Sequence, residues 1–262
     1  MDKKKPLNDQ YKIIAVLPAR YGSTRLPGKP LIKINGKPVI QYVYENISNS
    51  KMIDEVVVAT DDSRIFDETL KFGGKAVMTP SECKSGTDRI VYTIKNCGFN
   101  NYDIIVNVQG DEPLLKCSDV ESVILRLIKN DSDISTLAIK FKNISDVKNP
   151  NHVKAVLDKN FNALYFSRNV IPYPRDSEII PENYYKHIGV YVFKKHVLLK
   201  FETLPDSILE HTEKLEQLRL LESGYKISVA VTENETIGID TPEDVEKFNF
   251  LINSQNKKQY DL

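Results

Sequence analysis

The chain of 262 residues contains little cysteine, and its few cysteines form no recognisable disulfide or zinc pattern. Cys83, Cys97 and Cys117 are odd in number and lack CxxC spacing, so we expect free thiols in a reducing cytoplasm. The sequence has no run of about 18 apolar residues, which excludes a transmembrane helix. The charged stretch 1–10 is not followed by an apolar segment, so we expect no signal peptide there.

An excess of charge of one sign is also absent. The 36 Lys and Arg residues balance 36 Asp and Glu residues, and the isoelectric point is about 6.9. Because general nucleic-acid or membrane-surface binding depends on a basic excess, we expect neither nucleic acid nor membrane insertion for this protein.

The order of apolar patterns in the first half predicts an α/β fold with a doubly wound, mostly parallel sheet. Short apolar runs predict strands, and apolar residues at helical spacing between these runs predict crossover helices. The expected strands cover 12–17, 55–60, 75–79, 102–108 and 133–140.

The pattern changes after residue 140, where we expect an antiparallel elaboration of the same sheet. Residues 152–158 and 163–168 predict a hairpin, 185–193 a long strand, and 209–224 one amphipathic helix. A strand at 226–232 and a final helix opened by Thr241 and Pro242 complete the chain. We therefore expect a single domain, 1–262, made of a core, an elaboration and a last segment, with bounds 12–140, 141–235 and 236–253.

The stretch PARYGSTRLPGKP, residues 18–30, follows the first expected strand and has the composition of a triphosphate-binding loop. Three cations, Arg20, Arg25 and Lys29, lie among glycines that allow backbone N–H groups to converge. Arg binds phosphate oxygens in a bidentate way, and Lys acts as a point charge. The alternative is a surface loop whose cations face water.

Two common phosphate-binding motifs are excluded here. Five residues separate Gly22 from Gly28, and Pro30 follows Lys29, so the stretch is not a Walker A loop. The Rossmann pattern GxGxxG is absent as well. No Ser/His/Asp or Cys/His nucleophile is evident.

Two carboxylates predict a divalent metal site. Asp111, in NVQGDEP, follows a buried strand, and ligands of open parallel sheets bind at such strand ends. Asp240, in GIDTPEDV, precedes a helix and would be the second ligand, although it could instead serve only the helix dipole. Mg²⁺ usually takes one or two carboxylates together with substrate phosphates.

Other polar residues are ambiguous from their patterns alone. The SGTDR loop (85–89) could bind a base or ribose, or Ser85 could simply cap a helix. His187 lies in a predicted strand, where histidine is more often structural. Arg168 ends another strand, and the pair Glu216-Gln217 in a helix is usually solvated.

Taken together, the motifs resemble the 3-deoxy-manno-octulosonate (Kdo) cytidylyltransferases over residues 12–250. The motifs that carry the resemblance occur in the family's order and are PARYGSTRLPGKPL, SGTDR, NVQGDEP, ALYFSR, KHIGVY, LEQLR and GIDTPEDV. The resemblance implies a nucleotidyltransferase fold and a homodimeric cytoplasmic enzyme. Such an enzyme uses CTP and Mg²⁺ to make CMP-Kdo and pyrophosphate for lipopolysaccharide synthesis in Gram-negative bacteria.

The resemblance also implies roles for individual residues. The core would bind CTP, with Arg20, Arg25, Lys29 and Asp111 as the catalytic group. The residues implied to surround the nucleotide are Ala19, Arg20, Arg25, Lys29, Ser85, Gly86 and Gln109. Asp111 and Asp240 would hold the metal. The residues implied to contact the sugar acid are Arg168, His187, Tyr191, Glu216 and Gln217.

Two departures from the family pattern leave the identity of the sugar acid undecided. Tyr173 stands where Trp is common, and Val192 where Gly is common. A cytidylyltransferase for a related acid sugar such as 8-amino-Kdo is therefore an alternative. A transferase acting on a neutral sugar phosphate or alditol phosphate is another, and a non-catalytic nucleotide-sugar sensor is a third. His187 with Glu216-Gln217 argues against the second, and retention of both aspartates argues against the third.

Overall fold

The computed structural model describes residues 10–22, 26–83, 85–236, 238–239 and 241–260. The chain divides into two compact units, each assembled from separate stretches of sequence. Unit 1 comprises residues 1–13, 101–107 and 118–234, and unit 2 comprises 14–100, 108–117 and 235–262. The expected fold class is confirmed as mixed α/β with a mostly parallel sheet, whereas the expected single domain stays a prediction.

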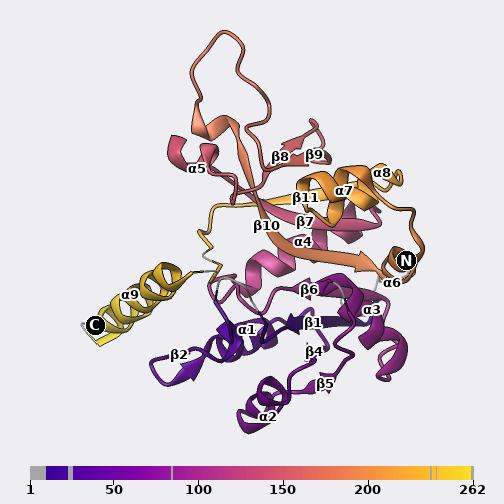
Figure 1. Ribbon diagram of the computed structural model, residues 1–262, viewed down its shortest axis with the longest axis vertical. Helices are drawn as coiled ribbons and strands as arrows, with labels where there is room; N and C mark the ends of the chain where they lie inside the picture. The colour runs from indigo at the N-terminus through magenta and orange to yellow at the C-terminus, as the bar shows by residue number, and fades with distance from the viewer. Residues whose placement is uncertain (1–9, 23–25, 84, 237, 240, 261–262) are drawn as a thin grey trace, which may run out of the picture. The chain divides into compact units, whose positions relative to one another are not determined.

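Unit 2 contains three parallel strands, β1 (Ile13–Ala19), β4 (Glu55–Thr60) and β5 (Ala76–Met78). All residues of β1, and all of β4 except Glu55, are buried, which explains their continuous apolar sequences. In register, Ala19 pairs with Thr60 and Thr60 with Met78, so the three carboxyl ends lie at one edge. Figure 1 shows these strands in indigo and purple, with α1 and α2 beside them.

Two helices of unit 2 begin at residues whose side chains cap them. The α2 helix (Ser63–Lys71) starts after Asp62, whose carboxylate accepts from the Arg64 N–H. The α3 helix (Gly86–Asn96) starts with a capping box between Ser85 and Asp88. The remaining elements are η2 (Lys29–Leu31), β2 (Lys33–Ile34), β3 (Lys37–Pro38), α1 (Val39–Ser48) and α9 (Pro242–Tyr260). The helix α9 extends to Tyr260.

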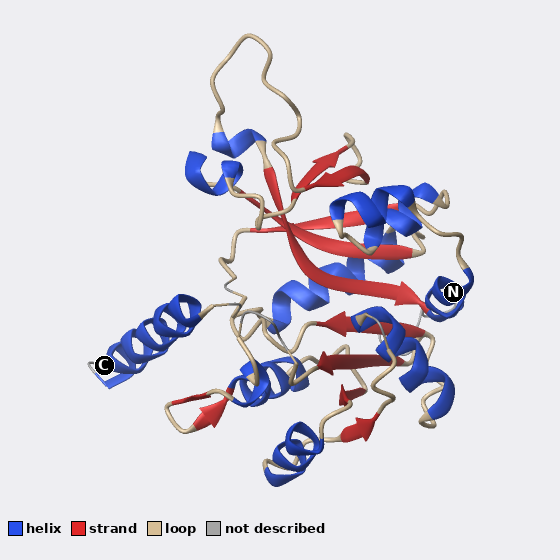
Figure 2. Ribbon diagram, in the orientation of Figure 1, coloured by secondary structure: helices blue, strands red, loops and turns tan. Residues whose placement is uncertain are grey.

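Unit 1 is built around β7 (Ile134–Lys140), which is parallel to β11 (Ile227–Thr232) and antiparallel to β10 (Tyr185–Lys194). The expected hairpin is confirmed as β8 (Lys154–Leu157) and β9 (Ala163–Ser167). Figure 2 shows β10 as a long curved arrow. The other elements are β6 (Ile104–Val108), α4 (Cys117–Lys129), α5 (Ile144–Lys148), η3 (Pro181–Asn183), α6 (Lys195–Lys200), η4 (Phe201–Thr203), α7 (Ile208–Glu213) and α8 (Gln217–Glu222).

The single helix expected over 209–224 is wrong, because the structure has two short helices there. Lys214, the residue after α7, has φ 55° and ψ 50° in the left-handed region, which ends the helix. The second helix, α8, starts at Gln217 and buries Gln217 and Leu218. The break therefore turns Gln217 inward, which a continuous helical pattern does not predict.

The cysteines and the helices can be compared with the expectations of free thiols and of no transmembrane helix. Cys83, Cys97 and Cys117 are all half-buried and form no disulfide. Burial raises the pKa of the Cys83 and Cys97 thiols. Within the described ranges, no helix combines the length and the apolar character needed to cross a bilayer.

Gly110 lies at a close approach of three segments of unit 2. A Cβ at this position would lie 3.0 Å from Ile40 Cδ1 and 3.2 Å from the Pro18 carbonyl oxygen. We predict that Gly110→Ala lowers the free energy of unfolding by about 1–3 kcal/mol, because the Pro18 backbone must shift. Urea unfolding measures this change. Gly22→Ala is the control, since a Cβ there meets nothing within 4 Å; equal losses in both variants would contradict the packing argument.

Candidate active site

The loop after β1 is held in place by contacts within unit 2. Arg20 Nη2 donates to the Cys83 carbonyl at 2.6 Å, which ties this loop to the chain just before α3. Gly28 adopts φ 68°, and its N–H donates to the Tyr21 carbonyl at 2.8 Å. A Cβ on Gly28 would lie 2.9 Å from the Tyr21 ring. The loop thus requires glycine here, and it turns the chain so that Lys29 follows at the start of η2.

Lys29 and Asp111 form an ion pair through Nζ and Oδ2. The structure therefore brings together two predicted site residues that are 82 positions apart in the sequence. Both side chains retain some solvent exposure, 17% for Lys29 and 22% for Asp111, so a ligand can reach them. Arg25 lies outside the described residues.

A third segment joins at Asp111. The Ile239 N–H donates to the Asp111 carbonyl at 2.8 Å. Downstream, Thr241 and Asp244 form reciprocal contacts at the start of α9, with Thr241 N to Asp244 Oδ2 at 2.9 Å. Asp240 itself lies outside the described residues. The second predicted metal ligand therefore remains a prediction, although Ile239 and Asp111 are in contact.

The expected metal can be tested against the donor groups that are present. Asp111 already binds a cationic group, the Lys29 ammonium, which shows that this carboxylate is placed to interact with a cation. One or two carboxylates plus phosphate oxygens are the usual protein ligands of Mg²⁺. No group of three or more His, Cys, Asp or Glu suited to a metal occurs among the described residues. Among the described residues Asp111 would be the carboxylate for such a cation, and substrate phosphates would supply further oxygens.

The expected nucleotide-side residues Gly86 and Gln109 lie next to each other. A Cβ on Gly86 would lie 3.5 Å from Pro18 Cγ and 3.7 Å from Gln109 Nε2. Ser85 serves the helix: its Oγ accepts from Asp88 N at 3.1 Å, and its own N–H donates to Asp88. The capping role is therefore present, and a contact from Ser85 to a nucleotide stays a prediction.

Arg89 was missed by the sequence reasoning. Its side chain is fully buried, and Nη2 donates to Asp61 Oδ2 at 2.8 Å while Nη1 contacts Thr79 Oγ1. Asp61 follows β4 and Thr79 follows β5, so Arg89 ties α3 to the carboxyl ends of both strands. Arg89 is the last residue of the SGTDR motif, but that motif was interpreted through the hydroxyl groups of Ser85 and Thr87.

On unit 1, the predicted sugar-side residues His187 and Tyr191 form an aromatic cluster. Their ring centroids are 5.3 Å apart, and Phe166 meets His187 edge-on at 5.0 Å. Desolvation lowers the pKa of His187 to about 3, so its imidazole is neutral at physiological pH. Burial, together with the charge of Glu216, raises the pKa of Tyr191.

Gln217, the first residue of α8, carries a buried polar atom. The side chain is 5% exposed, and its Nε2 lacks a hydrogen-bond partner within the described part of the chain. A buried amide without an acceptor is costly, on the order of 1–3 kcal/mol, unless a ligand or water supplies one. The arrangement fits an amide that donates a hydrogen bond to an oxygen of a bound substrate.

Arg168 is engaged by backbone carbonyls. Its Nε donates to Glu213 O at 2.8 Å and its Nη1 to Pro150 O at 3.2 Å. The Glu213 carboxylate accepts from Arg168 N at 2.9 Å, and fully buried Lys154 donates to the Arg168 carbonyl. Sequence reasoning missed Glu213 and Lys154, which fix this strand end. The sugar-binding role of Arg168 stays a prediction.

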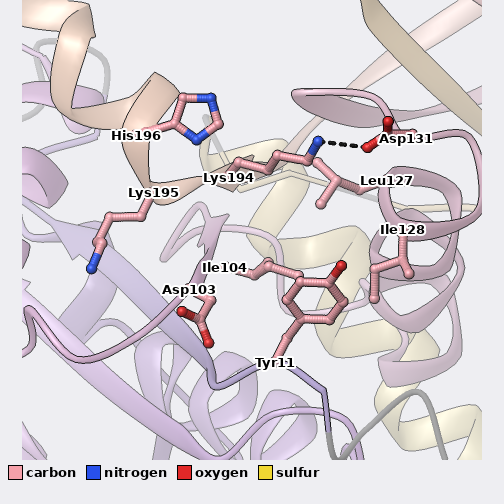
Figure 3. Close-up of a pocket in the computed structure, with 9 residues that line it drawn as sticks. All are labelled: Tyr11, Asp103, Ile104, Leu127, Ile128, Asp131, Lys194, Lys195 and His196. Atoms are coloured by element: carbon pink, nitrogen blue, oxygen red, sulfur yellow. Dashed lines mark hydrogen bonds and ion pairs between the residues drawn. The ribbon is translucent and has the colours of Figure 1, made fainter.

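A separate pocket of unit 1, shown in Figure 3, has a volume of about 260 Å³. Its lining residues are Tyr11, Asp103, Ile104, Leu127, Ile128, Asp131, Lys194, Lys195 and His196. Lys194 Nζ pairs with Asp131 at 2.9 Å across its rim. None of these nine residues belongs to the predicted site.

The α/β fold, with polar loops after parallel strands, matches a nucleotidyltransferase fold. At 17% identity and a TM-score of 0.64, a 4-diphosphocytidyl-2C-methyl-D-erythritol synthase from Anaerococcus prevotii shares this fold. A cytidylyltransferase family model matches residues 14–227. The chain belongs to this cytidylyltransferase family.

Individual relatives are more similar. A 3-deoxy-manno-octulosonate cytidylyltransferase from Thermodesulfovibrio yellowstonii is 51% identical, over 92% of this chain and 98% of the relative. An 8-amino-3,8-dideoxy-manno-octulosonate cytidylyltransferase from Shewanella halifaxensis is 46% identical, over 89% and 95%. The solved structure of a CMP:2-keto-3-deoxy-manno-octonic acid synthetase complexed with CTP is 41% identical, with a TM-score of 0.86, covering 93% and 99%.

The lowered pKa of His187 predicts a pH-dependent contribution to stability. Unfolding restores the ordinary pKa of about 6.5, so the unfolded chain binds more protons between about pH 3 and pH 6.5. Stability from this group is therefore complete above pH 6.5 and decreases as the pH falls. Wild type should lose unfolding free energy when the pH falls from 7 to 5. We predict that this loss is about 1–2 kcal/mol smaller in His187→Gln, which lacks the titrating group. Urea unfolding at both pH values measures this; equal losses would show that the pKa is not lowered.

Proposed function

We propose that the protein transfers CMP from CTP to the anomeric hydroxyl of Kdo, giving CMP-Kdo and pyrophosphate. The proposal is supported by identity of 48–51% over 92% of the chain to two relatives named as Kdo cytidylyltransferases. The likeness to a synthetase solved with CTP supports the nucleotide. The observation in this chain that carries the proposal is the contact between Lys29 and Asp111. It joins the loop after β1, which contains Arg20 and Lys29, to the loop after β6, which contains Asp111.

The nucleotide side of the reaction requires charge neutralisation more than covalent chemistry. Arg20, Arg25 and Lys29 would bind the triphosphate and stabilise the negative charge that accumulates on departing pyrophosphate. Asp111, with Asp240 as the second ligand, would hold Mg²⁺. Mg²⁺ held there would supply Lewis acidity at the phosphate and would favour ionisation of the attacking hydroxyl. Gly86 and Gln109 would lie along the cytidine.

On the sugar side, neutral His187, the Tyr191 hydroxyl and the Gln217 amide would bind sugar hydroxyls and the carboxylate. The Gln217 Nε2 is the donor best suited to an oxygen of the substrate, because it lacks an acceptor within the described chain. Burial, with a smaller contribution from the charge of Glu216, raises the pKa of Tyr191, so Tyr191 remains a neutral hydrogen-bond donor.

The proposed biological setting follows from the same relatives. We propose a homodimer in the cytoplasm that supplies CMP-Kdo for lipopolysaccharide. The second candidate substrate is 8-amino-Kdo, because relatives named for it are 46–47% identical over 89–90% of the chain. Loss of catalysis is disfavoured by the retained Lys29–Asp111 pair.

Pyrophosphate release tests the proposed function directly. We expect release when purified protein receives CTP, Mg²⁺ and Kdo, and little release when ATP, GTP or UTP replaces CTP. A panel that also contains 8-amino-Kdo, a sialic acid and a sugar phosphate ranks the substrates by kcat/KM. A highest value for 8-amino-Kdo would select the alternative, and release only with a sugar phosphate would contradict both acid-sugar assignments.

Asp111 should be required for turnover. We predict that Asp111→Asn lowers kcat about a hundredfold or more, because the uncharged amide neither holds a divalent cation nor pairs with Lys29. Asp62→Asn is the matched control: Asp62 caps α2 through the Arg64 N–H at 3.0 Å, and Asn caps equally well. Steady-state kinetics with saturating CTP measures both variants. Retention of full kcat in Asp111→Asn would remove Asp111 from the catalytic group.

A further inference from the structure

The irregular pairing of β10 with β7 shapes the cluster around His187. Ile188 pairs with Leu137, but the next pair along is Tyr191 with Thr136. Gly189 and Val190 are therefore two extra residues on β10, and they form a bulge. In a regular strand, residues four apart are separated by about 13 Å. The bulge brings the rings of His187 and Tyr191 to a centroid distance of 5.3 Å.

Thr136 lies opposite this bulge and is fully buried. Its Oγ1 is 2.7 Å from the Val190 carbonyl oxygen and 2.9 Å from His187 Nε2. A threonine hydroxyl has one hydrogen to donate and lone pairs to accept. A carbonyl oxygen can only accept, so the hydroxyl hydrogen is used on Val190.

The donor in the second contact is consequently the histidine. Thr136 Oγ1 accepts a hydrogen bond from His187, which means that Nε2 carries the ring hydrogen. Because the lowered pKa keeps the ring neutral, Nδ1 has no hydrogen and presents a lone pair. The edge-on Phe166 ring at 5.0 Å and the tilted Tyr191 ring at 5.3 Å limit rotation of the imidazole.

We propose that Thr136 is a positioning residue that fixes His187 as the Nε2–H tautomer, so that Nδ1 accepts a hydrogen bond from a hydroxyl of the sugar acid. The inference rests on the proposed function for its ligand, but the tautomer itself is a property of the free protein. A neutral ring that offers a lone pair is suited to a hydroxyl and unsuited to a carboxylate, which has no hydrogen to donate. His187 therefore selects a hydroxyl, and the carboxylate of the substrate belongs to other donors.

The tautomer can be measured without substrate. In ¹⁵N-edited NMR of the full chain, the two imidazole nitrogens of a neutral histidine have well-separated shifts, and the protonated nitrogen is identified by its couplings to the ring hydrogens. His187→Gln assigns the signal among the four histidines by its disappearance. We expect the wild-type protein at pH 7 to show protonated Nε2 and unprotonated Nδ1. Protonated Nδ1, or a charged ring, would overturn the proposal whatever reaction the protein catalyses.

Kinetics then tests the consequence for substrate. Thr136→Val keeps the shape of the side chain but removes the acceptor, and we expect mixed tautomers, a KM for Kdo raised about tenfold, and KM for CTP and kcat close to wild type. Thr136→Ser retains the hydroxyl and should restore both the tautomer and KM. Thr69→Val is the matched control, because buried Thr69 donates to Ile65 O at 2.8 Å within its own helix, α2.

Each remaining outcome decides the proposal. A raised KM for Kdo with an unchanged tautomer would overturn it and would assign Thr136 to holding the bulge alone. A changed tautomer with an unchanged KM for Kdo would also overturn it, because His187 Nδ1 would then accept no hydrogen bond from a sugar hydroxyl. If Thr136→Val does not fold, the wild-type spectrum and Thr136→Ser still decide the tautomer. Absence of Kdo turnover in wild type, with the expected tautomer, would reject the proposed function separately.

Discussion

The ion pair between Lys29 and Asp111 is the interaction on which the proposed nucleotide site depends. It joins the loop after β1 to the loop after β6, and the Ile239 N–H adds a third segment at the Asp111 carbonyl. Each segment follows a strand or precedes a helix, so the backbone of unit 2 fixes where the charges lie. A carboxylate beside a polyanionic substrate is unfavourable without a cation, and Lys29 supplies that cation in the free protein. We infer that the pair keeps both groups oriented before CTP binds.

Residues with a strong local signal were predictable from the sequence. The apolar runs of β1 and β4 are buried along their length, and such runs indicate parallel strands covered on both faces. Asp111 could be chosen because it follows a buried strand, and its contact with Lys29 agrees with that choice. The Gly28 turn was also foreseeable, since its positive φ is one that glycine adopts readily.

Features that depend on contacts between distant segments could not be predicted. Thr136 carries no motif, and its importance arises from a bulge on β10, 54 residues away at Val190. The helix break at Lys214 was missed because lysine rarely adopts positive φ, yet it is what turns Gln217 inward. Arg89 and Lys154 are buried cations, which sequence patterns place on the surface, and only their partners explain their burial.

A crystal structure of the protein with both CTP and Kdo bound would show whether the proposed residues bind the two substrates. We expect triphosphate oxygens on Arg20 and Lys29, a divalent cation on Asp111, and a sugar hydroxyl within hydrogen-bond distance of His187 Nδ1. This expectation would be contradicted by an intact Lys29–Asp111 pair with the triphosphate bound elsewhere. A sugar acid seated in the pocket of Tyr11 and His196, away from His187 and Gln217, would contradict it equally.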